Sequence, residues 1–245
     1  MKKITFSLLA ALITTAALAQ GETPEPLTIE DFTTSVAGPF GIGAMSPNPV
    51  DGNSFFRLVS GNKIVSYSYK NPNSETTLYS SAEIDGLTSV KWNGFEVSNS
   101  GSRILLWTGS KPIYRHSFTA DYYVADMVSG DTKKLSQEGG EEIATMSPDG
   151  THIAYVKGNN VYIKSLVYEE DGQGLNDAGT VQVTKDGKPN YIINAVPDWV
   201  YQEEFGLLNT FCWSPDGNTL AFVRFDESQV PLSSMMLYEG ACNPD

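Results

Sequence analysis

Cysteine, histidine and long apolar runs are all scarce in this chain. Its 245 residues include two histidines and two cysteines, Cys212 and Cys242, which is too few for a zinc-site pattern. We therefore expect no metal and no cofactor. We expect the cysteines to remain separate thiols, with Cys212 buried in a strand, although an exported chain could form a disulfide between them.

Basic residues are also few. The chain has 16 Lys and Arg against 29 Asp and Glu, for a formal net charge of −13. Phosphate binding needs clustered cations, so nucleic acid is not expected as a partner. An acidic surface suits ligands with a positively charged N-terminus, and solubility alone explains it equally well. The 40% hydrophobic composition argues for a globular fold and against wholesale disorder.

The longest apolar run lies at the start of the chain. Lys2 and Lys3 precede an apolar stretch from Ile4 to Leu18, which ends in the small-residue sequence Ala17-Leu18-Ala19. The stretch is shorter than the roughly 20 residues of a membrane-spanning helix, and its flanks are typical of a secretory signal peptide. We expect residues 1–19 to be a signal peptide, residues 20–245 to form the domain, and the protein to be periplasmic or secreted.

An internal repeat predicts the architecture. Four segments combine a hydrophobic residue, a serine and a turn, followed by an alternating strand: Met45–Asn48, Val97–Gly101, Met146–Gly150 and Trp213–Gly217. Pro, Asp or Asn, and Gly are the residues that tight turns require. The serines at 46, 98, 147 and 214 are spaced by 52, 49 and 67 residues. Periods of about 40–50 residues are typical of propeller blades, whereas sandwich strands recur about every 8–12 residues.

The repeat predicts an all-β fold with an incomplete β-propeller. Four repeats correspond to about three to four blades, and a closed propeller typically has roughly 4–8. The strands expected after the turns are Phe55–Val59, Arg103–Trp107, His152–Val156 and Thr219–Val223. Further alternating strands are expected at Lys63–Tyr69, Tyr122–Met127 and Asn160–Lys164.

The longest interval between repeats contains the candidate functional segment. Ala195–Phe205 places Trp199 and Tyr201 beside the carboxylates Glu203 and Glu204. Adjacent glutamates are usually only a solvated face. Insertions between repeat strands, however, often map to the functional face of a repeat protein.

Asp198–Phe205, with the sequence DWVYQEEF, resembles the double-glutamate motif of the dipeptidyl peptidase IV family of the prolyl oligopeptidase clan. Three further stretches are similar to the family in the same order: Leu27–Phe32 to its opening segment, Tyr114–Ala120 to its arginine-bearing strand, and Arg224–Pro231 to the blade after the motif. The resemblance runs from about Leu27 to the end of the chain. The double-glutamate motif together with RFDESQVP is highly specific, whereas the turns occur in many propellers.

The resemblance implies an eight-bladed propeller stacked on an α/β-hydrolase domain, with the hydrolase domain absent from this chain. In the family, two glutamates hold the substrate's free ammonium and an arginine contacts a substrate carbonyl; the matching positions are Glu203, Glu204 and Arg115. Carboxylates suit a buried ammonium, and a guanidinium offers a planar fork of donors. Gln202 stands where the family usually has a third glutamate, so a pair of Gln202 and Glu203 stays an alternative.

No Gly-x-Ser-x-Gly nucleophile motif occurs in the 245 residues. The resemblance implies a Ser, Asp and His triad beyond Asp245, so no catalytic residue is assigned and the chain alone is expected to be inactive. The whole enzyme would release X-Pro or X-Ala dipeptides from peptides with a free N-terminus through an acyl-enzyme, and it could form a homodimer. A prolyl tripeptidyl peptidase relative and a non-catalytic exported peptide-binding propeller remain alternatives.

Overall fold

The computed structural model describes residues 48–49, 52–71, 73–82, 84–168 and 175–233. These residues belong to one compact unit, Pro47–Asp245. The expected signal peptide, the segment Leu27–Phe32 and Cys242 lie outside the described residues.

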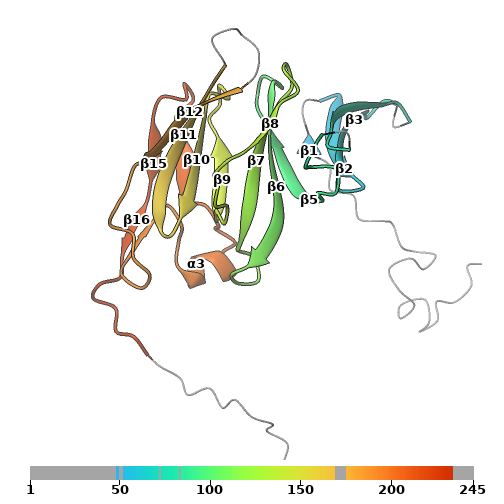
Figure 1. Cartoon of the computed structure of the whole chain (residues 1–245). Helices are drawn as coiled ribbons and strands as arrows, with labels where there is room; N and C mark the ends of the chain where they lie inside the picture. The colour runs from blue at the N-terminus through green and yellow to red at the C-terminus, as the bar shows by residue number, and fades with distance from the viewer. Residues whose placement is uncertain (1–47, 50–51, 72, 83, 169–174, 234–245) are drawn as a thin grey trace, which may run out of the picture. The chain divides into compact units, whose positions relative to one another are not determined.

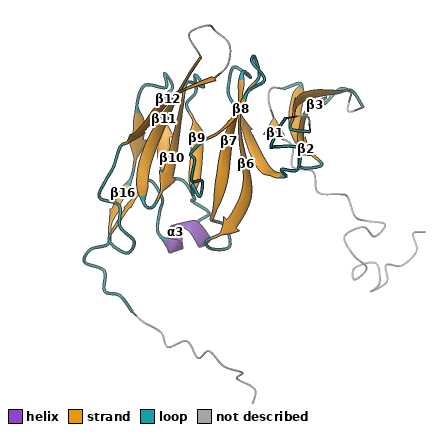
Figure 2. Cartoon of the chain, in the orientation of Figure 1, coloured by secondary structure: helices purple, strands orange, loops and turns teal. Residues whose placement is uncertain are grey.

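Three four-stranded antiparallel sheets follow one another along the chain (Figures 1 and 2). They comprise β1 (Asn48–Pro49), β2 (Ser54–Val59), β3 (Lys63–Ser68) and β4 (Glu75–Ser80); β5 (Trp92–Val97), β6 (Arg103–Pro112), β7 (Phe118–Asp126) and β8 (Thr132–Lys134); and β9 (Ile143–Met146), β10 (His152–Lys157), β11 (Asn160–Tyr168) and β12 (Leu175–Gln182). Within each sheet, strands that are consecutive in sequence are neighbours. This meander is the pattern of propeller blades.

The fourth repeat forms two small sheets. β13 (Ile192–Asn194) pairs with β16 (Arg224–Asp226), and β14 (Phe211–Trp213) pairs with β15 (Leu220–Phe222). The described sheets do not close into a ring, and the predicted all-β, incomplete propeller is confirmed. The only helix among the described residues, α3 (Trp199–Glu203), lies between β13 and β14 in sequence.

The repeated turn is built by the same hydrogen bonds at two positions. Between β9 and β10, Ser147 Oγ donates to Asp149 Oδ1 at 2.5 Å, and the backbone N–H of Ser147 donates to the His152 carbonyl at 2.8 Å. Between β14 and β15, Ser214 Oγ donates to Asp216 Oδ1, also at 2.5 Å. The hydrogen bond from Ser147 is the main cause that lowers the pKa of Asp149 to about 2. The serine and the aspartate therefore fix the direction in which the second strand leaves the turn.

Successive turns lie against one another. Gly150 and Gly217 have φ of 73° and 72°, a region that side chains other than glycine rarely adopt. A Cβ added at Gly217 would lie 3.0 Å from the Asp149 carboxylate, and one added at Gly150 would lie 3.3 Å from Ser98 Cβ. The glycines therefore serve both the turn geometry and the close approach of neighbouring sheets.

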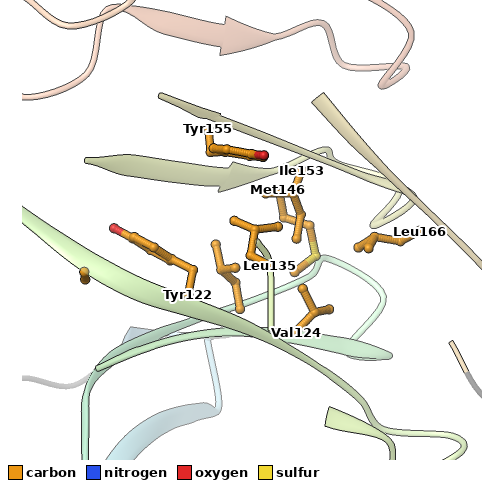
Figure 3. Packing of buried hydrophobic residues seen from close by; sticks show 9 residues of the cluster. Tyr122, Val124, Leu135, Met146, Ile153, Tyr155 and Leu166 are labelled. Carbon is orange, nitrogen blue, oxygen red and sulfur yellow. The ribbon is translucent and has the colours of Figure 1, made fainter. Parts of the chain in front are cut away.

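Apolar side chains fill the space between successive sheets. The cluster between the second and third sheets contains Leu105, Ala120, Tyr122, Val124, Leu135, Met146, Ile153, Tyr155 and Leu166. Figure 3 labels seven of these side chains, which come from β7, β9, β10 and β11 and, in the case of Leu135, from the residue after β8. Two comparable clusters lie on either side, one around Ile64 and Ile104 and the other around Val156 and Phe211. Burial of these faces holds the sheets together.

Arg103 joins the second sheet to the third. Its guanidinium lies 3.5 Å from the buried carboxylate of Asp126. It also donates to the carbonyls of Gly150 and Leu166, the latter at 3.2 Å. Gly150 belongs to the turn before β10, and Leu166 lies in β11. One buried side chain thus ties β6 to two segments of the next sheet.

Glu96 on β5 occupies the same junction beside the first strand of the third sheet. Its carboxylate accepts a hydrogen bond from the backbone N–H of Met146, at the end of β9. Burial raises the pKa of Glu96 to about 7, against an ordinary value of 4.5. The folded state therefore holds the proton of Glu96 more tightly than the unfolded state does.

We expect Glu96 to make the fold more stable in mild acid. Because its folded pKa is raised, its stabilising contribution is complete below the unfolded pKa of 4.5 and is lost as pH rises through about 7. Between pH 8 and pH 5, wild type should gain on the order of 2 kcal/mol in free energy of unfolding relative to Glu96→Gln. Urea denaturation of wild type and Glu96→Gln at both pH values measures these free energies of unfolding. If the free energy changed equally with pH in the two proteins, Glu96 would not be the group responsible.

Cys212 corrects one prediction from the sequence. It lies in strand β14 as expected, but it is exposed rather than buried. Successive side chains of a strand point to opposite faces, and on β14 it is Phe211 and Trp213 that pack into the apolar cluster.

In the described part of the chain, no helix has the length and apolar character needed to cross a membrane.

Candidate functional site

A short helix, α3 (Trp199–Glu203), carries the double-glutamate segment. Asp198 caps its N-terminus by accepting the Tyr201 N–H at 3.1 Å. The chain turns away beyond its C-terminus at Gly206, which has φ of 65°. Helical periodicity cannot be recognised over five residues, so the sequence did not predict this helix; the Asp198 cap was its available signal.

The helix orients its three polar side chains differently. Gln202 and Glu203 are buried, with residue exposures of 6% and 8%, whereas Glu204 is exposed. The amide nitrogen of Gln202 donates to the carbonyl of Pro197 at 2.6 Å. Gln202 is thus engaged in holding the start of α3, while Glu204 is available to solvent. Glu203 thus lies between a buried amide and an exposed carboxylate.

Arg115 lies in the connection between β6 and β7. The sequence predicted a strand over Tyr114–Ala120, but β7 begins at Phe118, so the strand placement of Arg115 was wrong. The N–H of Ile113 donates to the Ser117 carbonyl at 2.8 Å and closes a tight hairpin. The hairpin carries Arg115 at its tip, where the side chain is 74% exposed.

The fold brings Arg115 and Glu203 together from distant parts of the chain. Arg115 Nε lies 3.7 Å from Glu203 Oε2, and the backbone N–H of His116 donates to Glu203 Oε1 at 3.1 Å. Figure 1 shows α3 at the end of the sheets where β6 and β7 are joined. One carboxylate therefore connects α3 with the hairpin that carries the arginine.

Aromatic residues surround α3. The Tyr201 ring lies 5.7 Å from Phe205 and 6.3 Å from Phe225 between centroids. Tyr201 therefore packs against these two aromatic rings while remaining 44% exposed. Trp199 is 49% exposed. Asp226, at the end of β16, accepts the Ser228 N–H at 3.0 Å.

The site offers negative charge beside one guanidinium. A carboxylate has about four acceptor positions, and the two contacts at Glu203 leave capacity for a further donor. Glu204 follows directly and is exposed. Such a site suits a ligand whose cationic donor meets the carboxylates and whose carbonyl oxygen accepts from the guanidinium.

Within the described residues, no group of three or more His, Cys, Asp or Glu side chains could hold a metal ion.

Residues 98–243 match the family model of the dipeptidyl peptidase IV (DPP IV) N-terminal region. The chain belongs to this family. A solved dipeptidyl peptidase 4 from Porphyromonas gingivalis is 35% identical and has a TM-score of 0.69, covering 91% of this chain and 31% of that chain. The likeness supports a propeller region of the DPP IV type.

Curated relatives agree with the family. A probable dipeptidyl peptidase 4 from Arthroderma benhamiae is 39% identical over 141 residues, which is 56% of this chain and 17% of that protein. A prolyl endopeptidase FAP from Bos taurus is 28% identical over 222 residues, covering 90% of this chain and 27% of that protein. The chain thus spans less than a third of the length of these relatives.

Proposed function

We propose that this chain is the substrate-anchoring propeller portion of an exported serine peptidase that releases N-terminal X-Pro or X-Ala dipeptides. The observation that carries the proposal is the meeting of Arg115 with Glu203 at the end of the sheets where α3 lies. Glu203 and Glu204 hold the ammonium of the substrate, and Arg115 contacts a substrate carbonyl. Membership of the DPP IV family supports this reading.

The proposed binding depends on opposite charges. A substrate ammonium loses water when it binds, so it needs carboxylate partners within hydrogen-bond distance. Arg115 keeps Glu203 oriented and offsets part of its negative charge, while Glu204 supplies a second carboxylate. An anchor at a fixed distance from a nucleophile determines the length of the released product. The nucleophile belongs to a separate domain, so this chain alone is expected to be inactive.

The binding step can be tested on the chain itself. We expect the dipeptide amide Val-Pro-NH2 to bind at least tenfold more tightly than its Nα-acetyl form, because acetylation removes the charge that the glutamates recognise. Isothermal titration calorimetry at pH 6.5 provides the comparison. Equal affinities for the two peptides would rule out an ammonium anchor.

Product length separates the related activities. In a protein that joins this chain to its catalytic domain, mass spectrometry of a digested proline-containing peptide should find dipeptides; tripeptides would instead indicate the tripeptidyl relative.

We also propose export through the signal peptide at residues 1–19. N-terminal sequencing of the exported protein should then begin at Gln20.

A further inference from the structure

A cavity is lined by β5, β9 and β14, the strands that precede the turns of three successive repeats. It has a volume of about 270 Å³, and we call it the Glu96 cavity. Where β5 pairs with β6, Val97 lies opposite Ile104, at the far end of β6 from the hairpin that carries Arg115. The Glu96 cavity is therefore separate from the proposed ammonium anchor.

The side chain of Glu96 points toward the third sheet. Phe95 and Val97, its neighbours on β5, pack into the apolar cluster around Ile64. Because successive side chains of a strand point to opposite faces, Glu96 faces β9 instead. Its hydrogen bond from the backbone N–H of Met146 agrees with this direction.

One oxygen of this carboxylate can be reached by a ligand. The single N–H of Met146 occupies one of the two oxygens. The other forms no hydrogen bond or ion pair with the residues that the structure describes, and it is not one of their fully buried polar atoms. Glu96 is only partly buried and lines the cavity, so this oxygen is accessible from the cavity.

The cavity combines that carboxylate with aromatic walls. None of the described residues that line it is Lys, Arg or His. Burial raises the pKa of Glu96 to about 7, as expected for a carboxyl group that has lost water without gaining a cationic partner. Phe211 and Trp213 also line the cavity, and aromatic rings attract organic cations. An ammonium group on an apolar body would complement both features.

The titratable neighbours of Glu96 supply no cation. Burial, followed by the carboxylates of Glu141 and Glu96, raises the pKa of Tyr122 on β7, so this phenol stays neutral. Glu141 adds negative charge on the same side. His152 lies on the side of β14, with its ring 6.1 Å from that of Trp213 between centroids, but it does not line the cavity.

We propose that the Glu96 cavity is a binding site for a small alkylammonium cation. The ammonium donates to the accessible oxygen of Glu96, and the alkyl chain lies against Phe211 and Trp213. The charge-assisted hydrogen bond selects a cation, and the rings select an apolar body. The site needs neither the ammonium anchor nor peptidase activity, so its failure would leave the proposed function untouched.

n-Butylamine and n-butanol form a matched pair of probes, because they have the same chain and only the amine is a cation at pH 8. Calorimetric titration of the 245-residue chain should find butylamine binding with a Kd on the order of 1–10 mM. Butanol should bind at least roughly tenfold more weakly. Absence of saturable butylamine binding, or butanol binding as tightly, would overturn the proposal.

A third probe identifies the source of the ammonium group. Nα-acetyl-lysine amide carries the same alkylammonium on a peptide unit. If it binds more tightly than butylamine, the site accepts a lysine side chain of a polypeptide. If it binds more weakly, the site accepts a free amine.

The protonation of Glu96 gives a second readout. Because its pKa in the folded protein is about 7, Glu96 is ionised at pH 8 and protonated at pH 5, so butylamine should bind at least roughly tenfold more weakly at pH 5. Glu96→Gln should bind butylamine at least roughly tenfold more weakly than wild type at pH 8 and should lose the pH response. Unchanged affinity in Glu96→Gln, or a pH response as large as that of wild type, would contradict the proposal.

Two lysine variants place the binding in the cavity. Cys212 is exposed and lines the cavity, so Cys212→Lys brings a competing ammonium to Glu96 and should abolish butylamine binding. Val181→Lys is the matched control, because Val181 is 65% exposed and does not line the cavity. It adds the same charge and should bind butylamine as wild type does. Equal butylamine affinity in the two variants would locate the binding elsewhere and overturn the proposal.

Discussion

Replacing Glu203 by Gln is expected to lower kcat/KM for free-amine X-Pro substrates by on the order of 100-fold in a protein that joins this chain to its proposed catalytic domain. The variant keeps the shape of the side chain and its acceptor for the His116 N–H. It removes the charge that faces Arg115 and would face the substrate ammonium. Loss of one partner from a buried charge pair at a binding interface costs about 2–5 kcal/mol of binding free energy.

The kinetic comparison needs a matched control. Glu138 also forms an ion pair, with Lys157 at 2.9 Å, but its side chain is 85% exposed. Glu138→Gln should therefore change kcat/KM less than twofold, since exposed pairs contribute little. If Glu203→Gln were as active as Glu138→Gln, Glu203 would have no part in substrate anchoring.

Arg103→Met is expected to lower the free energy of unfolding by about 3 kcal/mol, since breaking a buried ion pair leaves an uncompensated charge. The variant retains a flexible apolar side chain at this position but leaves Asp126, which is 1% exposed, without its guanidinium. It also removes the donors to Gly150 and Leu166 on the next sheet. Urea denaturation measures the change.

Two further variants identify the origin of that loss. Lys157→Met removes the exposed pair with Glu138 and should cost less than about 1 kcal/mol. Adding Asp126→Asn to Arg103→Met should recover part of the lost free energy of unfolding, because the double variant no longer buries an unpaired negative charge. A loss at Arg103→Met as small as that at Lys157→Met would mean that Arg103 does not hold the two sheets together.

The connection between the sheets matters for the site. Arg115 is carried by the second sheet, whereas α3 follows the third sheet in sequence. The distance between Arg115 and Glu203 therefore depends on how the second and third sheets pack. Arg103 and the apolar cluster around Leu105 determine that packing. In this way the hydrophobic interior positions a polar site at the end of the sheets.

Local patterns predicted much of the fold. The Ser-Pro-Asp-Gly turns and the alternating strands depend on residues that are close in sequence, and both appear where the pattern placed them, as at β10 and β11. The exposure of Cys212 was missed because strand alternation leaves open which face of β14 packs inward. The sheet of β13 and β16 joins segments some 30 residues apart, for which the sequence carries no register signal.

The candidate site was predictable only in part. The resemblance to the family pointed to Glu203, Glu204 and Arg115 as candidates, but it could not place Arg115 on a hairpin or join it to Glu203. The contact between that hairpin and α3 spans 87 residues, from His116 to Glu203, and it depends on the packing of whole sheets.

The most direct test of the proposed anchor is a crystal structure of this chain, or of a longer protein that contains it, with a bound X-Pro peptide. We predict that the peptide ammonium lies within about 3 Å of carboxylate oxygens of both Glu203 and Glu204, with a peptide carbonyl facing Arg115. A peptide bound with its ammonium away from both glutamates would contradict the proposed anchoring function.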